Sequence, residues 1–130
     1  MKCLIVRPPF AEYIVNGTKS VEYRKRKTNV RGRIGIIEAG TSKVIGDVYL
    51  YDCNYNPDIY LWEWCFASYR KFLEPITIQR KKGAIVWEEI SDIPYNGVVA
   101  VPCLSPFDFI IEEKECHKLE QEFIQKYVRS

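Results

Sequence analysis

Residues 18–24, with the sequence TKSVEYR, bring together three ionisable side chains of different kinds: Lys19, Glu22 and Arg24. The ammonium group of Lys19 could contact a phosphate or carbonyl oxygen, or act as a base if it were desolvated. The carboxylate of Glu22 could accept hydrogen bonds from the exocyclic amine of a nucleobase, and Arg24 could bind a phosphate through two parallel hydrogen bonds. In the alternative interpretation, Glu22 forms an ion pair with a neighbouring arginine on an ordinary strand. Residue types alone favour this alternative.

The elements around this segment place it at a junction between a helix and a strand. Residues 9–16 predict a helix of about two turns, since a proline suits its first turn and Gly17 suits a left-handed C-terminal cap. Residues 19–24 then alternate as a strand, in which Lys19 and Glu22 would point to opposite faces. Because the glycine makes the start of this strand irregular, we predict that Lys19 turns toward Glu22 and that both side chains face one cleft.

Positive charge is concentrated in the first quarter of the chain. Residues 1–33 contain nine Lys or Arg and two acidic residues, a net charge of +7, whereas the rest of the chain carries −5. This asymmetry favours an anionic partner, with a solvated charged loop as the alternative. The predicted loop at residues 25–32 contains Lys25, Arg26 and Lys27. Further positive charge beside the cleft is expected from Arg7, Arg31 and Arg33.

The rest of the chain alternates short apolar runs with turn residues. Strands are predicted for residues 2–6, 33–39, 43–53, 83–90 and 98–103. The aromatic-rich run at 59–72 predicts a helix, and residues 116–128 predict an amphipathic C-terminal helix. Five or six short strands with few helices indicate an α+β fold, a small mixed or antiparallel β-barrel with helices at its side. The length of 130 residues fits a single domain over residues 1–130.

Aromatic side chains are candidates for stacking on a nucleobase, an interaction that contributes on the order of 1–3 kcal/mol per base. The aromatic residues of the predicted helix at 59–72 recur at helical spacing, so we assign them to the core. Phe10 and Trp87 are nearer the candidate cleft. We predict that these two side chains contact the ligand.

Several kinds of chemistry find no support in the sequence. The five cysteines lack paired spacing, so we expect neither a disulfide framework nor a zinc site, and we predict a reducing cytoplasmic location. His117, the only histidine, lies beside Cys116 in an acidic segment and is expected to be solvated surface rather than part of a catalytic triad or metal site. No phosphate-binding glycine loop or metal-binding motif occurs, and no apolar run is long enough to span a membrane. We therefore expect no metal, no cofactor and no membrane contact.

Three stretches of the first forty residues resemble the ASCH family (activating signal cointegrator homology). These stretches are RPPFAE at residues 7–12, GTKSVEYR at residues 17–24 and RGRIGI at residues 31–36. The family's signature is a proline, an aromatic residue and an alanine that open a helix, then G-x-K-x-x-E-x-R, then R-G before an apolar strand. The resemblance continues more loosely to about residue 103, whereas we place no family counterpart for the C-terminal extension at 104–130.

The resemblance implies a PUA-like β-barrel with a cleft lined by the G-x-K-x-x-E-x-R segment, and a role in RNA binding or RNA-related processing. One subgroup of the family resembles small amidohydrolases that act on acetylated cytidine with a lysine, a threonine and a glutamate, and others resemble ribonucleases. Lys19 falls on the lysine position, whereas Glu22 stands where the threonine would be. Glu63, in the predicted aromatic helix, is the nearest candidate for the glutamate.

We therefore predict a domain that binds RNA or a modified nucleotide in a cleft bordered by Lys19, Glu22 and Arg24. The first alternative is a small amidohydrolase or nuclease in which Lys19 and Glu22 are the catalytic residues. The second alternative is a protein-interaction module whose basic face contacts an acidic partner.

Overall fold

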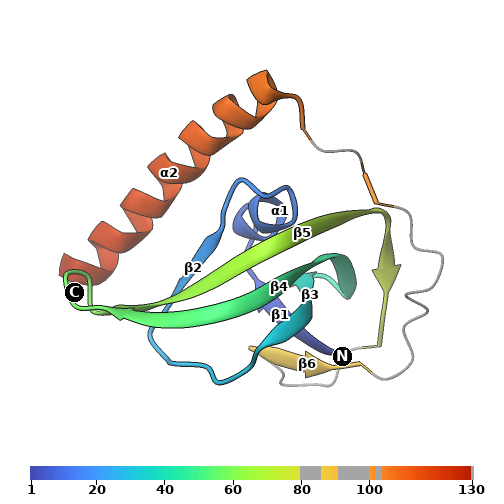
Figure 1. The fold of residues 1–130 in the computed structure, drawn as a ribbon, viewed down its shortest axis with the longest axis horizontal. Helices are drawn as coiled ribbons and strands as arrows, with labels where there is room; N and C mark the ends of the chain where they lie inside the picture. The colour runs from blue at the N-terminus through green and yellow to red at the C-terminus, as the bar shows by residue number, and fades with distance from the viewer. Residues whose placement is uncertain (80–85, 91–99, 102–103, 130) are drawn as a thin grey trace.

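The structure, a computed structural model, describes residues 1–79, 86–90, 100–101 and 104–129 (Figure 1). Within these ranges it has six strands and two helices. The strands are β1 (Lys2–Val6), β2 (Val21–Arg24), β3 (Gly32–Glu38), β4 (Lys43–Asn56), β5 (Leu61–Thr77) and β6 (Trp87–Glu89). The helices are α1 (Phe10–Val15) and α2 (Pro106–Arg129). No helix among the described residues is long and apolar enough to cross a membrane.

All six strands form one mixed sheet in the order β2-β5-β4-β3-β1-β6. The β1–β3 pair is parallel, and the other pairs are antiparallel. This confirms the α+β class and the number of strands. The predicted closure into a barrel needs correction, because β2 and β6 are unpaired edges of an open sheet in the part of the chain that the structure describes.

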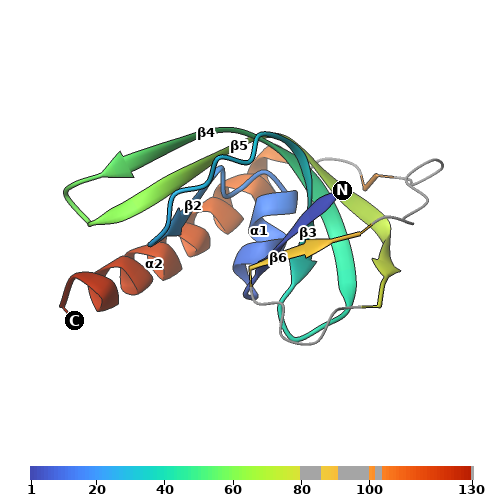
Figure 2. The same ribbon diagram turned by 90° about the horizontal axis from the view of Figure 1, so that it is seen from below.

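The longest pairing joins β4 to β5, and it is irregular. The register between these strands shifts between Val44 and Gly46, between Asp47 and Tyr49 and between Leu50 and Asp52. Such bulges bend and twist a strand pair. The β4–β5 hairpin therefore runs through the middle of the sheet and then projects as an arm away from β1 and β6 (Figure 2).

The helix predicted for residues 59–72 is wrong, since this segment lies in β5. Local spacing suggested a helix, but pairing with both β4 and β2 decides the structure, and aromatic residues suit a pleated, half-buried surface. The expected burial of its aromatic residues is confirmed for Trp64, Phe66 and Phe72, which are at most 5% exposed. Tyr69, by contrast, is 41% exposed.

The core lies between α1 and one face of the sheet. Ala11, Ile14 and Val15 of α1 pack in one cluster with Ile36 and Leu50 of the sheet. Each fully buried aliphatic side chain of this kind contributes about 1.5–3 kcal/mol. Packing against this face fixes α1 and therefore the chain that leaves it toward β2.

The C-terminal helix is longer than predicted and joins the rest of the domain at a few points. Its first turn is capped by Ser105, whose hydroxyl accepts a hydrogen bond from the Asp108 amide at 3.2 Å. Of its described side chains, Cys116, Glu120 and Ile124 are buried. Figure 1 shows α2 running past β2 and α1 at one end of the sheet.

The two strands predicted near the C-terminal third are described only in part. β6 is a three-residue strand within the segment predicted at 83–90. In the segment predicted at 98–103, Ala100 forms an isolated antiparallel bridge with Phe72. The other residues of that second segment, apart from Val101, lie outside the described residues.

Candidate ligand-binding pocket

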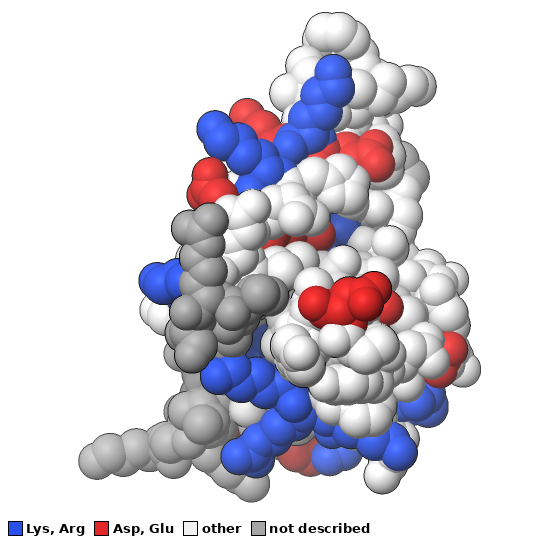
Figure 3. All heavy atoms as spheres, turned by 90° about the vertical axis from the view of Figure 1, so that its left-hand side faces the viewer, with Lys and Arg blue, Asp and Glu red and all other residues white. Residues whose placement is uncertain are grey.

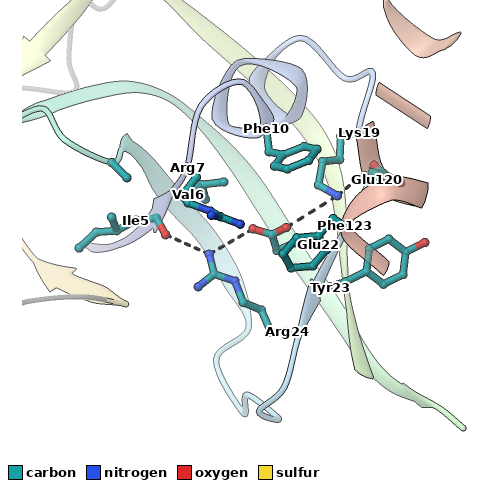
Figure 4. A pocket seen from close by; sticks show the side chains of 11 residues that line it. Ile5, Val6, Arg7, Phe10, Lys19, Glu22, Tyr23, Arg24, Glu120 and Phe123 are labelled. Atoms are coloured by element: carbon teal, nitrogen blue, oxygen red, sulfur yellow. Dashed lines mark hydrogen bonds and ion pairs between the residues drawn. The ribbon is translucent and has the colours of Figure 1, made fainter. Parts of the chain in front are cut away.

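A cavity of about 250 Å³ opens where the end of β1, the start of α1, the edge strand β2 and helix α2 come together (Figure 4). Three aromatic rings and five charged side chains surround it. The lining residues are Ile5, Val6, Arg7, Phe10, Lys19, Glu22, Tyr23, Arg24, Ala39, Glu120 and Phe123. The charged set consists of three cations and two carboxylates, so the pocket carries a slight excess of positive charge.

Lys19 occupies the centre of this arrangement although it is only 4% exposed. Its backbone N–H donates to the carbonyl of Tyr13 at 3.0 Å, which ties the segment before β2 to helix α1. Its ammonium nitrogen lies 2.9 Å from Oε1 of Glu120 and 3.7 Å from Oε1 of Glu22. The same nitrogen lies 5.1 Å from the ring centres of both Phe10 and Tyr23. Two carboxylates and two ring faces therefore hold this charge in a buried position.

Glu22 links Lys19 to Arg24. Its Oε2 accepts a hydrogen bond of 3.1 Å from Nη2 of Arg24, which also donates to the carbonyl of Ile5 at 2.9 Å. β2 begins only at Val21, so Lys19 precedes the regular strand. Its side chain therefore does not have to follow the alternation of side chains between the two faces of the strand. The structure brings Lys19, Glu22 and Arg24 to one cavity for this reason.

Arg7 and Phe123 form the more open part of the pocket. The Arg7 side chain is exposed, and its guanidinium carbon lies 5.7 Å from the ring centre of Phe123. The Phe123 ring packs edge-on against Phe10, with centroids 6.3 Å apart. Among the described residues, Arg7 forms no ion pair, so its charge can meet an anion from outside the protein.

Helix α2 also changes the acid–base properties of the pocket wall. Burial, with a further contribution from the charge of Glu120, raises the pKa of Tyr23 to about 12. Burial and a hydrogen bond to Glu120 raise the pKa of the Cys116 thiol to about 12. At neutral pH both groups are therefore uncharged, and the Tyr23 hydroxyl can donate a hydrogen bond.

Two lining residues, Glu120 and Phe123, were missed by sequence reasoning. Phe123 was expected on the apolar stripe of the C-terminal helix, but nothing local tied that stripe to the pocket. Glu120 follows Cys116 and precedes Ile124 at intervals of four residues, so it lies in the middle of the buried face. An acidic residue at such a position rarely lacks a buried partner, and this was the available signal.

Four predicted site residues lie away from the pocket. Arg33 of β3 donates to the buried Asp47 of β4 at 2.8 Å. Arg31 donates to the carbonyls of Thr28 and Val30 at 3.1 and 2.8 Å within its own loop.

Trp87 and Glu63, the other two, belong to the sheet. Trp87 stacks on Trp64, with centroids 5.7 Å apart and planes 13° apart, and packs against the main core. Glu63 lies on β5, opposite Tyr23 in the register with β2, and not on a helix as predicted. The geometry therefore assigns Trp87 to packing rather than to the pocket.

The basic loop between β2 and β3 is exposed and lies beside the projecting hairpin. Trp64 donates from its indole N–H to the carbonyl of Arg26 at 3.0 Å, and the ammonium of Lys27 lies 5.9 Å from the ring centre of Trp62. Lys25, Arg26 and Lys27 do not line the cavity. They follow Arg24 directly in the chain, so the loop begins at the pocket wall.

The cysteines and acidic residues give no metal centre in the described ranges, where no group of three His, Cys, Asp or Glu side chains is placed to hold an ion. Cys53, Cys65 and Cys116 are free thiols. His117 is on the exposed side of α2, with its Nε2 3.6 Å from Oε1 of Glu113.

Comparison with known proteins agrees with this architecture. The ASCH domain family matches residues 4–127, a range that reaches into α2 and includes every residue lining the pocket. The crystal structure of ASCH from Zymomonas mobilis has a TM-score of 0.50 with 21% sequence identity, covering 59% of this chain and 73% of that one. Two mutant forms of that protein, also at 21% identity, have TM-scores of 0.49 and 0.47; they cover 59% and 58% of this chain and 75% and 72% of theirs. No curated protein matches the sequence.

At this identity the structural similarity to the Zymomonas mobilis protein concerns the fold alone. The family match, in contrast, extends over nearly the whole chain and includes the G-x-K-x-x-E-x-R segment that places Lys19, Glu22 and Arg24 at the cavity. The chain therefore belongs to the ASCH domain family.

Proposed function

We propose that this protein binds RNA or a nucleotide-like ligand, with one base held in the pocket around Lys19. The observation that carries the proposal is the combination of aromatic rings with a buried Lys19–Glu22 ion pair in a single small cavity. A nucleobase presents a ring face for stacking and an edge with both donors and acceptors, and this cavity offers partners for each. ASCH domains belong to a PUA-like group often linked to RNA binding, which supports the same conclusion.

The size of the cavity favours a single base rather than a folded nucleic acid. Its volume of about 250 Å³ lies just below the range of ordinary small-molecule pockets, which is roughly 300–1,000 Å³. Lys19 and Arg24 can donate hydrogen bonds to a base carbonyl, and Glu22 can accept from an exocyclic amine. Arg7, exposed at the open part, is positioned for the phosphate of the same nucleotide.

Calorimetric titration of the four ribonucleoside monophosphates and their nucleosides tests this assignment. We expect Lys19→Ala to weaken nucleotide binding at least tenfold, and Arg7→Ala to weaken monophosphates more than nucleosides. Lys43→Ala is the matched control, because Lys43 is exposed at the start of β4 and does not line the cavity. Equal affinities for all three variants would refute the proposed site.

A second candidate, hydrolysis of an acylated nucleoside, is supported by the 2.9 Å contact between Lys19 and Glu120. Glu120, rather than Glu63, would then supply the carboxylate of the lysine–glutamate pair. The Lys19 ammonium contacts both Glu120 and Glu22, at 2.9 and 3.7 Å, so both carboxylates beside it are already engaged in ion pairs. Binding is therefore the first choice. Incubation with acetylated cytidine distinguishes the two, since release of free cytidine that is lost in Lys19→Ala would establish the hydrolase.

We also infer that the protein works in a reducing compartment, the cytoplasm. The support is the free state of Cys53, Cys65 and Cys116, of which Cys116 is almost fully buried. A protein partner for the basic face is the remaining alternative. In that case the protein would not bind RNA, although the pocket variants fold normally.

A further inference from the structure

The end of the β4–β5 hairpin presents exposed aromatic side chains that the pocket does not use. Tyr55 is 46% exposed and lies against Trp62 on the paired strand, with ring centroids 5.2 Å apart. Tyr60, in the connecting turn, is 73% exposed. Two of these rings are exposed and the third, Trp62, is half-buried, and together they form an aromatic surface at one end of the hairpin.

The basic loop supplies positive charge next to these rings. Lys25, Arg26 and Lys27 are all exposed, and the ammonium of Lys27 lies 5.9 Å from the ring centre of Trp62. Among the described residues Arg26 and Lys27 form no ion pair, so their charges are available to an anionic ligand. Lys and Arg side chains gather along the lower part of the face shown in Figure 3. Asp58 and Glu63 of the same hairpin reduce the local charge but do not cancel it.

Hydrogen bonds hold the hairpin end and the loop in place. The Asp58 amide donates to Oδ1 of Asn56 at 3.0 Å, which orders the turn between the strands. The indole of Trp64 binds the carbonyl of Arg26 at 3.0 Å and thereby fastens the loop to the hairpin. A preformed surface of this kind loses little conformational entropy when a ligand binds.

The hairpin surface is continuous with the pocket. In the β2–β5 pairing, Glu22 is opposite Trp64 and Arg24 is opposite Trp62. The step from the pocket carboxylate to the Trp62 position is thus two residues along a strand, about 7 Å. A nucleotide next to a base held in the pocket can reach the aromatic pair across this distance.

We propose that the ligand is single-stranded RNA, and that nucleotides flanking the base in the pocket stack on Tyr55 and Trp62 with their phosphates against Lys25–Lys27. This proposal rests on the function proposed above and extends it from a mononucleotide to a strand. Alternating cations and aromatic faces along a groove are the usual means of binding a single strand without reading its sequence. Rings with cations beside them suit a single-stranded nucleic acid, whose bases stack and whose phosphates are charged, better than a protein or lipid partner.

Fluorescence anisotropy with a labelled single-stranded RNA of about eight nucleotides tests the proposal. We expect Tyr55→Ala to weaken oligonucleotide binding about tenfold, or about 1.4 kcal/mol, and Tyr55→Phe to retain it. The matched control is Tyr49→Ala, because Tyr49 lies on the same strand, is 45% exposed and pairs with Arg33 of β3 rather than with the end of the hairpin. Neither tyrosine variant should change the affinity for a mononucleotide.

The outcomes separate the two proposals. If Tyr55→Ala and Tyr49→Ala bind the oligonucleotide equally well, the hairpin surface is not a binding site, while mononucleotide binding that depends on Lys19 would leave the pocket assignment standing. If mononucleotides do not bind but the oligonucleotide does so through Tyr55, the pocket assignment fails and the hairpin surface stands. Tryptophan fluorescence supplies a second measurement, because stacking on Trp62 should quench emission with the oligonucleotide and not with the mononucleotide.

Discussion

Asp47 on β4 and Glu22 on β2 are both buried carboxylates that contact two cations each. Asp47 is fully buried, and accepts from Arg33 at 2.8 Å and from Arg70 at 2.6 Å. Glu22 is 7% exposed, and lies 3.7 Å from Lys19 and 3.1 Å from Arg24. The two clusters have nearly the same composition, yet all three charges of the Glu22 cluster line one cavity, whereas in the described part of the chain only Arg70 of the Asp47 cluster lines a cavity, a second one of about 260 Å³.

The difference lies in what surrounds the charges. Arg33 and Arg70 cover Asp47 from the neighbouring strands β3 and β5 and bridge three strands of the sheet. Around Glu22, the elements come from distant parts of the chain and meet imperfectly, so that aromatic rings and an exposed arginine enclose an empty space. A buried ion pair therefore indicates a binding site only when it faces a space that a ligand can enter.

The largest effect is expected from Asp47→Ala. This change removes a carboxylate that accepts three charge-assisted hydrogen bonds and leaves two arginines without it, so the free energy of unfolding should fall by about 2–4 kcal/mol. The arginines remain partly hydrated, which limits the loss. Urea denaturation gives the free energy, and nucleotide affinity below the midpoint should be unchanged. A variant of normal stability would contradict a purely structural role for this cluster.

Glu22→Gln should show the opposite pattern. The amide keeps one hydrogen-bond acceptor, and Lys19 retains its contact with Glu120, so stability should fall by only about 1 kcal/mol. Nucleotide affinity should fall at least tenfold, because an amide binds an exocyclic amine more weakly than a carboxylate does. If the urea midpoint drops as far as in Asp47→Ala while affinity is retained, the two clusters have the same structural role.

A third, smaller effect on stability comes from the α2 side of the pocket and depends on pH. The pKa of Cys116 is about 12 in the folded protein and near 9 otherwise, so above pH 9 the unfolded chain loses this proton while the folded chain keeps it. The contribution of this thiol to the free energy of unfolding should be fully present below pH 9. It should then fall by about 1.4 kcal/mol per pH unit toward pH 12. Tyr23 adds to the loss only above pH 10.

Urea midpoints at pH 8 and pH 10 measure this effect. Cys116→Ala removes the contribution of the thiol, so its midpoints should differ less between the two pH values than those of the parent protein. Equal differences would mean that Cys116 is not buried against Glu120 in solution.

The smallest effect is expected from chelators and reductants. Since Cys53, Cys65 and Cys116 are free and no metal cluster occurs in the described ranges, a melting curve with EDTA or with dithiothreitol should shift by no more than about a degree or two. A large change in melting temperature with either reagent would require a bound metal or a disulfide. Stability would then depend on a feature outside both ion-pair clusters.

The part of the site built from adjacent residues could be predicted, and the part built by long-range contact could not. Lys19, Glu22 and Arg24 lie within six residues at a helix–strand junction whose irregular start is visible in the sequence. Glu120 contacts Lys19 across 101 residues of chain, and no local pattern specifies which acid on a helix will meet which lysine. Arg33 was assigned to the ligand for the same reason, since its partner Asp47 is on another strand.

The fold shows the same limit. The strands at 2–6, 33–39 and 43–53 and the helix before Gly17 were predictable from short apolar runs bounded by turn residues. The run at 59–72 was predicted as a helix, because its aromatic spacing fits one and its pairing with β2 and β4 is invisible locally. Tertiary context decides between helix and strand in such segments.

Gly17 begins the G-x-K-x-x-E-x-R segment, and its backbone has a φ of +80°, which favours glycine. A Cβ at this position would also collide with the ring of Tyr69. The glycine of the motif is thus required by the backbone conformation between α1 and β2, whereas the lysine and glutamate of the motif border the cavity. In a library randomised over residues 17–24, selection for folding alone should already recover glycine at the first position. Selection for ligand should restrict the lysine and the two charged positions that follow it more strongly than selection for folding does.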